Sequence, residues 1–182
     1  MIDAEKLTKW SKEIYENAVA HGWHEEKHSS EHYLGLVMTE VAEAVEADRK
    51  NKRANTYLMR EREAQKTPWW KSNYEQWVKG SIEEEFADIV IRLLDMAVEL
   101  HGDDFVWKFP KGWIRPNKNL SVCENAWIFV RYSLNTSIFH IVGSICFVHE
   151  WAEHLGIDLD THIELKMRYN ATREYKHGNK KY

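Results

Sequence analysis

Apolar residues recur every three or four positions along most of the chain, the spacing of a helix that buries one face. The first such stretch begins after Asp3, a good N-cap residue, and ends at Gly22. A second begins after residues 29–30 and fades into the polar stretch 48–53. No alternating strand pattern persists anywhere. The pattern predicts five to seven helices and no sheet.

Two Ser-x-x-Glu sequences, beginning at Ser81 and Ser121, are typical of capping boxes at helix starts. The first precedes a strongly apolar helix that ends at Gly102. The second precedes one long helix, or two separated near Asn135, and this pattern ends at Gly156. Both boxes place the start of a helix within one residue.

A last helix begins at Asp158 or Asp160, either of which can act as the N-cap, and runs to about Tyr175. The other segments lack a sustained helical pattern, and we expect them to be irregular: residues 54–80, 103–120 and 176–182.

The chain has 182 residues and a mass of 21.7 kDa, which is the size of one domain. Its net charge of −4 argues against a general nucleic-acid coat, although a local basic patch is compatible with it. Two cysteines make no disulfide framework. The N-terminus has no apolar signal core, and polar residues interrupt the most apolar run, 126–148. We therefore expect a soluble cytoplasmic protein with no membrane partner.

Two pairs of carboxylates occur at helical spacing. Glu40 and Glu43 lie three residues apart, as do Glu85 and Asp88, so each pair shares a helix face beside an apolar stripe. If the two stripes pack together, four carboxylates converge, and they cannot stay close and ionised without a cation. Oxygen ligands alone select a hard ion, so Mg²⁺ is expected, with Mn²⁺ as a substitute. Asp95 is a further candidate ligand on the same face.

The alternative is that these pairs are ordinary solvated helix faces, where Glu-x-x-Glu is common. The chain holds another such pair, Glu150 and Glu153, within the sequence HEWAEH. This is not the zinc-protease motif, because Glu153 stands where the second histidine must be. We interpret it as a polar helix end, with mixed His/Glu metal binding as the alternative.

The C-terminal helix carries a basic stripe. Lys166, Asn170 and Arg173 are spaced four and three residues apart, so they line one face, and Lys176 follows. Arg168 points elsewhere on the helix. Beside a metal site these donors would suit a polyphosphate, with lysine as a point charge and arginine as a fork. The alternative is a basic solvated surface.

Three stretches together resemble the MazG-like branch of the all-α nucleoside triphosphate pyrophosphatases, a superfamily that includes dimeric dUTPases. They cover about a third of the chain, in the family's order: residues 23–50, 83–97 and 156–180. The family pattern is Glu-x-x-Glu, a spacer, then Glu-x-x-Asp. The strings EFADIVIRLLD and KMRYNATREYKHG are much more specific than the carboxylate spacing alone.

The resemblance implies an all-α helical bundle over residues 1–182 that hydrolyses an NTP or dNTP between the α- and β-phosphates. The products would be a nucleoside monophosphate and pyrophosphate. It assigns the metal to Glu40, Glu43, Glu85 and Asp88, with Glu43 as our choice of catalytic base. It assigns the phosphates to Lys166, Asn170, Arg173, Tyr175 and Lys176. It also implies a homodimer or a higher homo-oligomer.

The chain departs from the family by insertions at about 51–80 and 103–155. The first insertion holds three of the nine tryptophans, Trp69, Trp70 and Trp77, which either stack on a base or anchor the insertion to the core. Trp23 and His28 are the other candidates for the base pocket.

Two rival functions stay open at this point. One is a non-enzymatic helical interaction module whose basic C-terminal tail binds RNA or a partner protein. The other is a hydrolase of the same superfamily that is dedicated to dUTP or to a signalling nucleotide.

Overall fold

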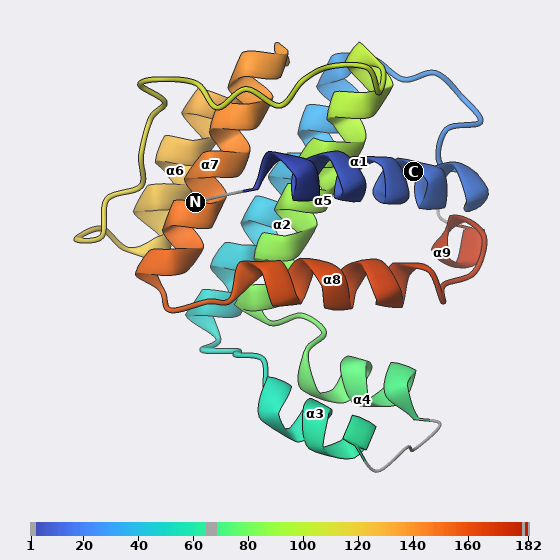
Figure 1. Ribbon diagram of the computed structural model, residues 1–182. Coiled ribbons are helices and arrows are strands. Elements are labelled where there is room, and N and C mark those ends of the chain that lie inside the picture. The colour runs from blue at the N-terminus through green and yellow to red at the C-terminus, as the bar shows by residue number, and fades with distance from the viewer. Residues whose placement is uncertain (1–2, 65–68, 180, 182) are drawn as a thin grey trace.

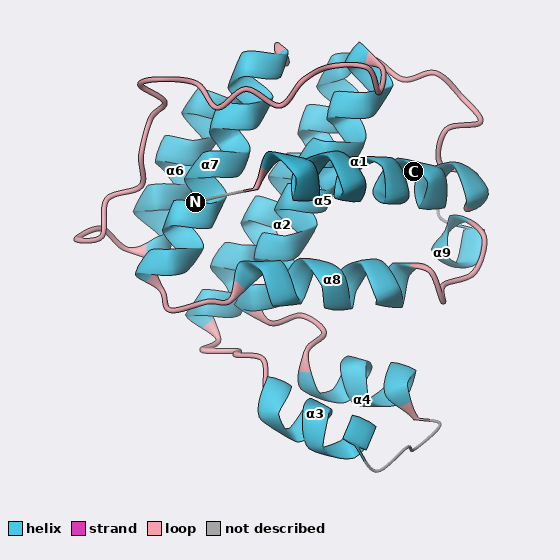
Figure 2. Cartoon of the chain, viewed as in Figure 1, coloured by secondary structure: helices cyan, strands magenta, loops and turns pink. Residues whose placement is uncertain are grey.

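All regular structure in the computed structural model is helical over the residues that it describes, 3–64, 69–179 and 181 (Figures 1 and 2). The all-α prediction is therefore confirmed. The helices are α1 (Ala4–Ala20), α2 (Ser30–Arg49), α3 (Thr56–Ala64), α4 (Trp70–Trp77), α5 (Ile82–His101), α6 (Val122–Ser133), α7 (Ile138–His154), α8 (Leu159–Asn170) and α9 (Lys176–Asn179).

The helix α5 lies at the centre of the bundle. It is apolar on most of its circumference, and such a helix must be buried on several sides. It packs against α1, α2, α7 and α8, and α2 runs antiparallel beside it (Figure 1). Polar residues on α5 are therefore held against neighbouring helices instead of facing bulk water.

The start of α5 differs from an ordinary capping box. Ser81 accepts the backbone N–H of Glu84 at 3.2 Å, as predicted. The side chain of Glu84 does not return to Ser81 but accepts the N–H of Gly80. At Ser121, by contrast, both halves of the capping box form. The carboxylate of Glu84 is thus available for tertiary contacts.

Several expectations about the helices need correction. Nine helices lie within the described residues, where five to seven were predicted, and the short α9 lies in the tail that was expected to be irregular. The segment 54–80 is more regular than its pattern indicated, because it contains α3 and α4, which lie on either side of residues 65–68, outside the described ranges. The last long helix ends at Asn170 and not near Tyr175. The chain then turns back, and the N–H of Lys176 donates to the carbonyl of His21 at 3.0 Å.

The remaining boundaries follow the sequence. The pattern that allowed one or two helices before Gly156 resolves into two, α6 and α7, separated at residues 134–137. Residues 103–120 are a loop, as expected. Within the described ranges, no helix is both long and apolar enough to cross a membrane.

The loop between α1 and α2 is fixed to α5 through a buried histidine. The His24 side chain is 5% exposed, and its Nε2 and Nδ1 lie 2.8 Å and 3.2 Å from the carboxylates of Asp95 and Glu99. Tyr15 of α1 donates to Glu99 at 2.8 Å, and the Tyr33 ring of α2 stacks on the imidazole. Burial lowers the pKa of His24, but the two carboxylates outweigh burial and raise it overall.

We predict that His24→Gln destabilises the fold more at low pH than at high pH. The folded-state pKa lies above the usual 6.5, so the stabilisation is fully present below that pH and is lost as pH rises through the folded value. Urea unfolding at about pH 6 should show a loss of about 2 kcal/mol, and this loss should shrink near pH 9. The exposed His154→Gln is the control. An equal loss at both pH values would contradict the assignment.

Candidate functional site

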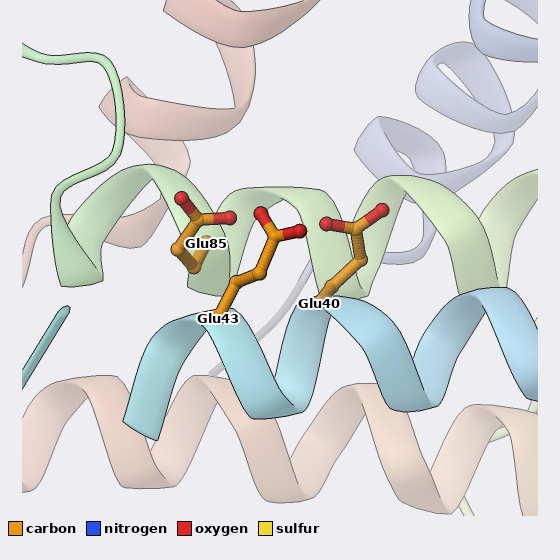
Figure 3. Close-up of side chains that lie close together, drawn as sticks. All are labelled: Glu40, Glu43 and Glu85. Atoms are coloured by element: carbon orange, nitrogen blue, oxygen red, sulfur yellow. The ribbon is translucent and has the colours of Figure 1, made fainter. Parts of the chain in front are cut away.

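Three of the four predicted metal ligands meet between α2 and α5. Glu40 and Glu43 extend from α2 and Glu85 extends from α5, and one oxygen of each lies within 4.8 Å of the others (Figure 3). Glu40 and Glu85 are buried, whereas Glu43 is exposed. The i, i+3 spacing on α2 and the antiparallel partner helix together produce this cluster.

The fourth predicted ligand, Asp88, is placed differently. Its carboxylate lies 2.6 Å from the ammonium of Lys166, which crosses from α8. Lys166 also contacts Glu84 at 2.7 Å, and its side chain is 9% exposed. Asp88 therefore lies next to the acidic cluster but is neutralised by a lysine that sequence reasoning assigned to the phosphates.

Glu84 is a site residue that the sequence analysis did not select. Its side chain is 2% exposed and accepts from Tyr74 at 2.9 Å, from Lys166 and from the N–H of Gly80. Its position in the predicted capping box assigned this glutamate only a local role, so its tertiary contacts were not predicted. The one available signal was that three consecutive glutamates, Glu83 to Glu85, begin a helix that is otherwise apolar.

A second cation borders the cluster. The Nε of Arg92, on α5, lies 3.0 Å from Glu40. Burial lowers the pKa of Arg92, but the carboxylates of Glu40 and Asp88 outweigh it and raise the value. Asp95, the further candidate ligand, is instead engaged by His24.

Even with these two cations in place, two of the carboxyl groups, Glu85 and Asp88, have raised pKa values. Burial raises the pKa of Glu85 to about 9, and repulsion from Asp88 and Glu84 adds to the effect. Burial also raises the pKa of Asp88, although Lys166 opposes this. Without a cation Glu85 is therefore protonated near neutral pH, and a bound divalent cation would favour its ionised form. Three carboxyl groups supply the oxygen donors that a hard divalent cation requires. The residues of this cluster therefore fit Mg²⁺ or Mn²⁺.

The carboxylates open into a cleft of about 920 Å³ that α1, α2, α5 and α8 enclose. Lys166 and Asn170, which their spacing placed on one helix face, both line it. Arg173 also lines it, but from beyond the end of α8, so helical spacing does not account for its position. The Oδ1 of Asn170 is buried, and no described residue provides it with a hydrogen-bond partner. Arg168, which the spacing placed on another face, also lines the cleft, and its guanidinium lies 4.1 Å above the Trp70 ring.

Tyr175 and Lys176 are not among the residues that line this cleft. Both contact Glu25 in the loop between α1 and α2, at 2.6 Å from the tyrosine hydroxyl and 3.2 Å from the lysine ammonium. The Tyr175 ring packs on Gly22, whose φ of +79° favours glycine and where a Cβ would collide with the ring. These two residues thus hold the loop in place, and they lie apart from the other three residues that were predicted to bind the phosphates.

The three tryptophans of the insertion do not line the cleft. Trp69 is 64% exposed, and Trp70 stacks on Tyr74 in a small apolar cluster, which agrees with an anchoring role. Trp23 lines the cleft, with the His177 ring at 5.0 Å. His28 lines a separate pocket of about 30 Å³.

None of the family models, curated proteins or solved structures compared with this chain matches it. A function for the cleft must therefore be inferred from its own side chains and from the sequence resemblance.

We predict that Mg²⁺ stabilises the folded protein and that Glu43→Gln removes this effect. At a cation concentration about tenfold above Kd, binding should contribute about 1.4 kcal/mol. That corresponds to a rise in Tm of about 3–6 °C for a chain of this size. Differential scanning fluorimetry with MgCl₂ and with chelator measures it.

Glu153→Gln is the matched control, because it neutralises an exposed glutamate of the other Glu-x-x-Glu pair. Its response to Mg²⁺ should equal that of the wild type. An unchanged Mg²⁺ response in Glu43→Gln would show that the cation binds elsewhere.

Proposed function

We propose that this protein is a Mg²⁺-dependent nucleoside triphosphate pyrophosphohydrolase of the MazG-like type. It would cleave an NTP or dNTP between the α- and β-phosphates to a nucleoside monophosphate and pyrophosphate. The observation that supports this most directly is that the acidic cluster and the basic stripe line the same cleft. A solvated helix face and an unrelated basic surface would not need to share one cavity.

The cleft has carboxylates that could hold a cation and basic residues that could bind phosphate oxygens, so it suits a polyphosphate bound through a cation. Glu40, Glu43 and Glu85 would hold Mg²⁺, with Asp88 as a neighbouring ligand. When bound, the ion would supply positive charge to the phosphate oxygens and acidify a water molecule. Without a cation, the same carboxylates would repel a triphosphate.

The residues that line the cleft have separate roles in this proposal. Glu43 is the exposed member of the cluster, so it can receive the proton of the attacking water while Glu40 and Glu85 stay buried. Lys166 and Arg173 hold the departing pyrophosphate by charge-assisted hydrogen bonds. Asn170 offers the Nδ2–H groups of its amide as neutral donors to the phosphate oxygens.

Both Glu43→Gln and Asp88→Asn are expected to lower turnover by at least about 100-fold, because each removes a carboxylate while preserving shape. Pyrophosphate release from a panel of NTPs and dNTPs, with Mg²⁺ and with chelator, measures this loss. Circular dichroism should show nearly unchanged helicity. Glu153→Gln, outside the cleft, should retain full turnover.

Three results would contradict the proposal. Wild-type turnover in either site variant would remove these residues from the reaction. Orthophosphate as the first product would point to a different bond. A purified protein that releases no pyrophosphate from any member of the panel would favour the non-enzymatic interaction module.

A further inference from the structure

The inserted segment between α2 and α5 is joined to the cleft by a specific set of contacts. Its helix α4 packs on α8 in a small apolar cluster that is separate from the main core, and Figure 1 shows α3 and α4 lying below α8. The Tyr74 and Tyr169 rings stack at 4.5 Å, and the Tyr169 hydroxyl donates to Glu75 at 2.9 Å. The insertion therefore contacts the turns of α8 that carry Lys166.

One of these contacts extends into the acidic site. The fully buried Tyr74 donates its hydroxyl to Oε1 of Glu84 at 2.9 Å. The same oxygen accepts the ammonium of Lys166 at 2.7 Å, and that ammonium continues to Asp88 at 2.6 Å. The chain of contacts thus runs from the insertion, through Glu84 and Lys166, to a predicted metal ligand.

The position of the hydroxyl determines how strongly Glu84 competes for Lys166. A hydrogen bond to the ionised carboxylate spreads its charge and weakens its hold on the ammonium. Of the three ammonium donors, Glu84 and Asp88 occupy two, so one can serve a ligand in the cleft that Lys166 lines. Loss of the hydroxyl would leave Glu84 holding Lys166 more tightly.

We infer that Tyr74 and Glu84 are positioning residues that set the Lys166 ammonium for a polyphosphate, so that the insertion is part of the substrate site. This inference rests on the proposed function, because Lys166 needs a polyphosphate ligand. Tyr74 acts only through Lys166, and it touches neither the phosphate nor the cation.

The test compares Tyr74→Phe with Tyr57→Phe. Tyr57 is a matched control in the same insertion, since its exposed hydroxyl donates to Glu61 on the surface of α3. Calorimetry measures the affinity for inorganic pyrophosphate in the presence of Mg²⁺, and separately the affinity for Mg²⁺ alone. We expect Tyr74→Phe to weaken pyrophosphate binding about tenfold with little change in Mg²⁺ binding, and Tyr57→Phe to change neither.

A double-mutant cycle with Lys166→Gln tests the route of the effect. If Tyr74 acts through Lys166, then adding Tyr74→Phe to Lys166→Gln causes no further loss of pyrophosphate affinity. Unfolding curves confirm that each variant is folded. If Lys166→Gln is unstable, the comparison of Tyr74→Phe with Tyr57→Phe still shows whether pyrophosphate binding depends on Tyr74.

These binding measurements separate the inference from the proposed function. Pyrophosphate binding that depends on Tyr74, in a protein that hydrolyses no nucleotide, would support the inference and contradict the proposed reaction. Equal pyrophosphate affinity in Tyr74→Phe and Tyr57→Phe overturns the inference, whatever the turnover. A parallel loss of Mg²⁺ affinity in Tyr74→Phe also overturns the inference, because it would indicate a general structural role. A wild-type protein that binds no pyrophosphate overturns it as well.

Discussion

The burial of several carboxylates beside α5 is the constraint on which the rest of the cleft depends. Glu84, Glu85 and Asp88 lie along one turn and a half of this helix, and α2 adds Glu40 and Glu43. Charges this close in a buried place must be protonated, paired or bound to a cation. Here Lys166 pairs with two of them and Arg92 with a third, whereas Glu43 is exposed to solvent. Burial raises the pKa of Glu85 to about 9, and we propose that a bound divalent cation would stabilise its ionised form.

This arrangement explains why the carboxylates and the basic residues line one cleft. Lys166 comes from α8, so the ion pairs that neutralise Glu84 and Asp88 also bring the stripe to the cleft. The insertion stabilises the same contact from the other side through the stacked rings of Tyr74 and Tyr169. A helix pair that was only structural would gain more from an apolar interface, since buried ion pairs contribute little net stability.

Much of the fold was predictable because local rules dominate it. Asp3, Ser81 and Ser121 are N-caps, and the paired carboxylates share helix faces through spacing alone. The helices of the insertion were missed, because their apolar positions face a small separate cluster and Pro68 interrupts the pattern. The tertiary ion pairs could not be predicted either, because no spacing rule links Lys166 to Asp88, 78 positions earlier. The early end of α8 likewise removed Tyr175 and Lys176 from the predicted phosphate set.

We propose that Glu40, Glu43 and Glu85 jointly hold a divalent cation that faces a triphosphate. A crystal grown with Mn²⁺ and a non-hydrolysable α,β-methylene nucleotide would test this arrangement, because anomalous scattering locates the metal. We expect a peak at coordination distance from all three carboxylates, with phosphate oxygens on its other side and Lys166 near the terminal phosphates. A peak that contacts none of these glutamates, or a nucleotide bound away from the cleft, would contradict it.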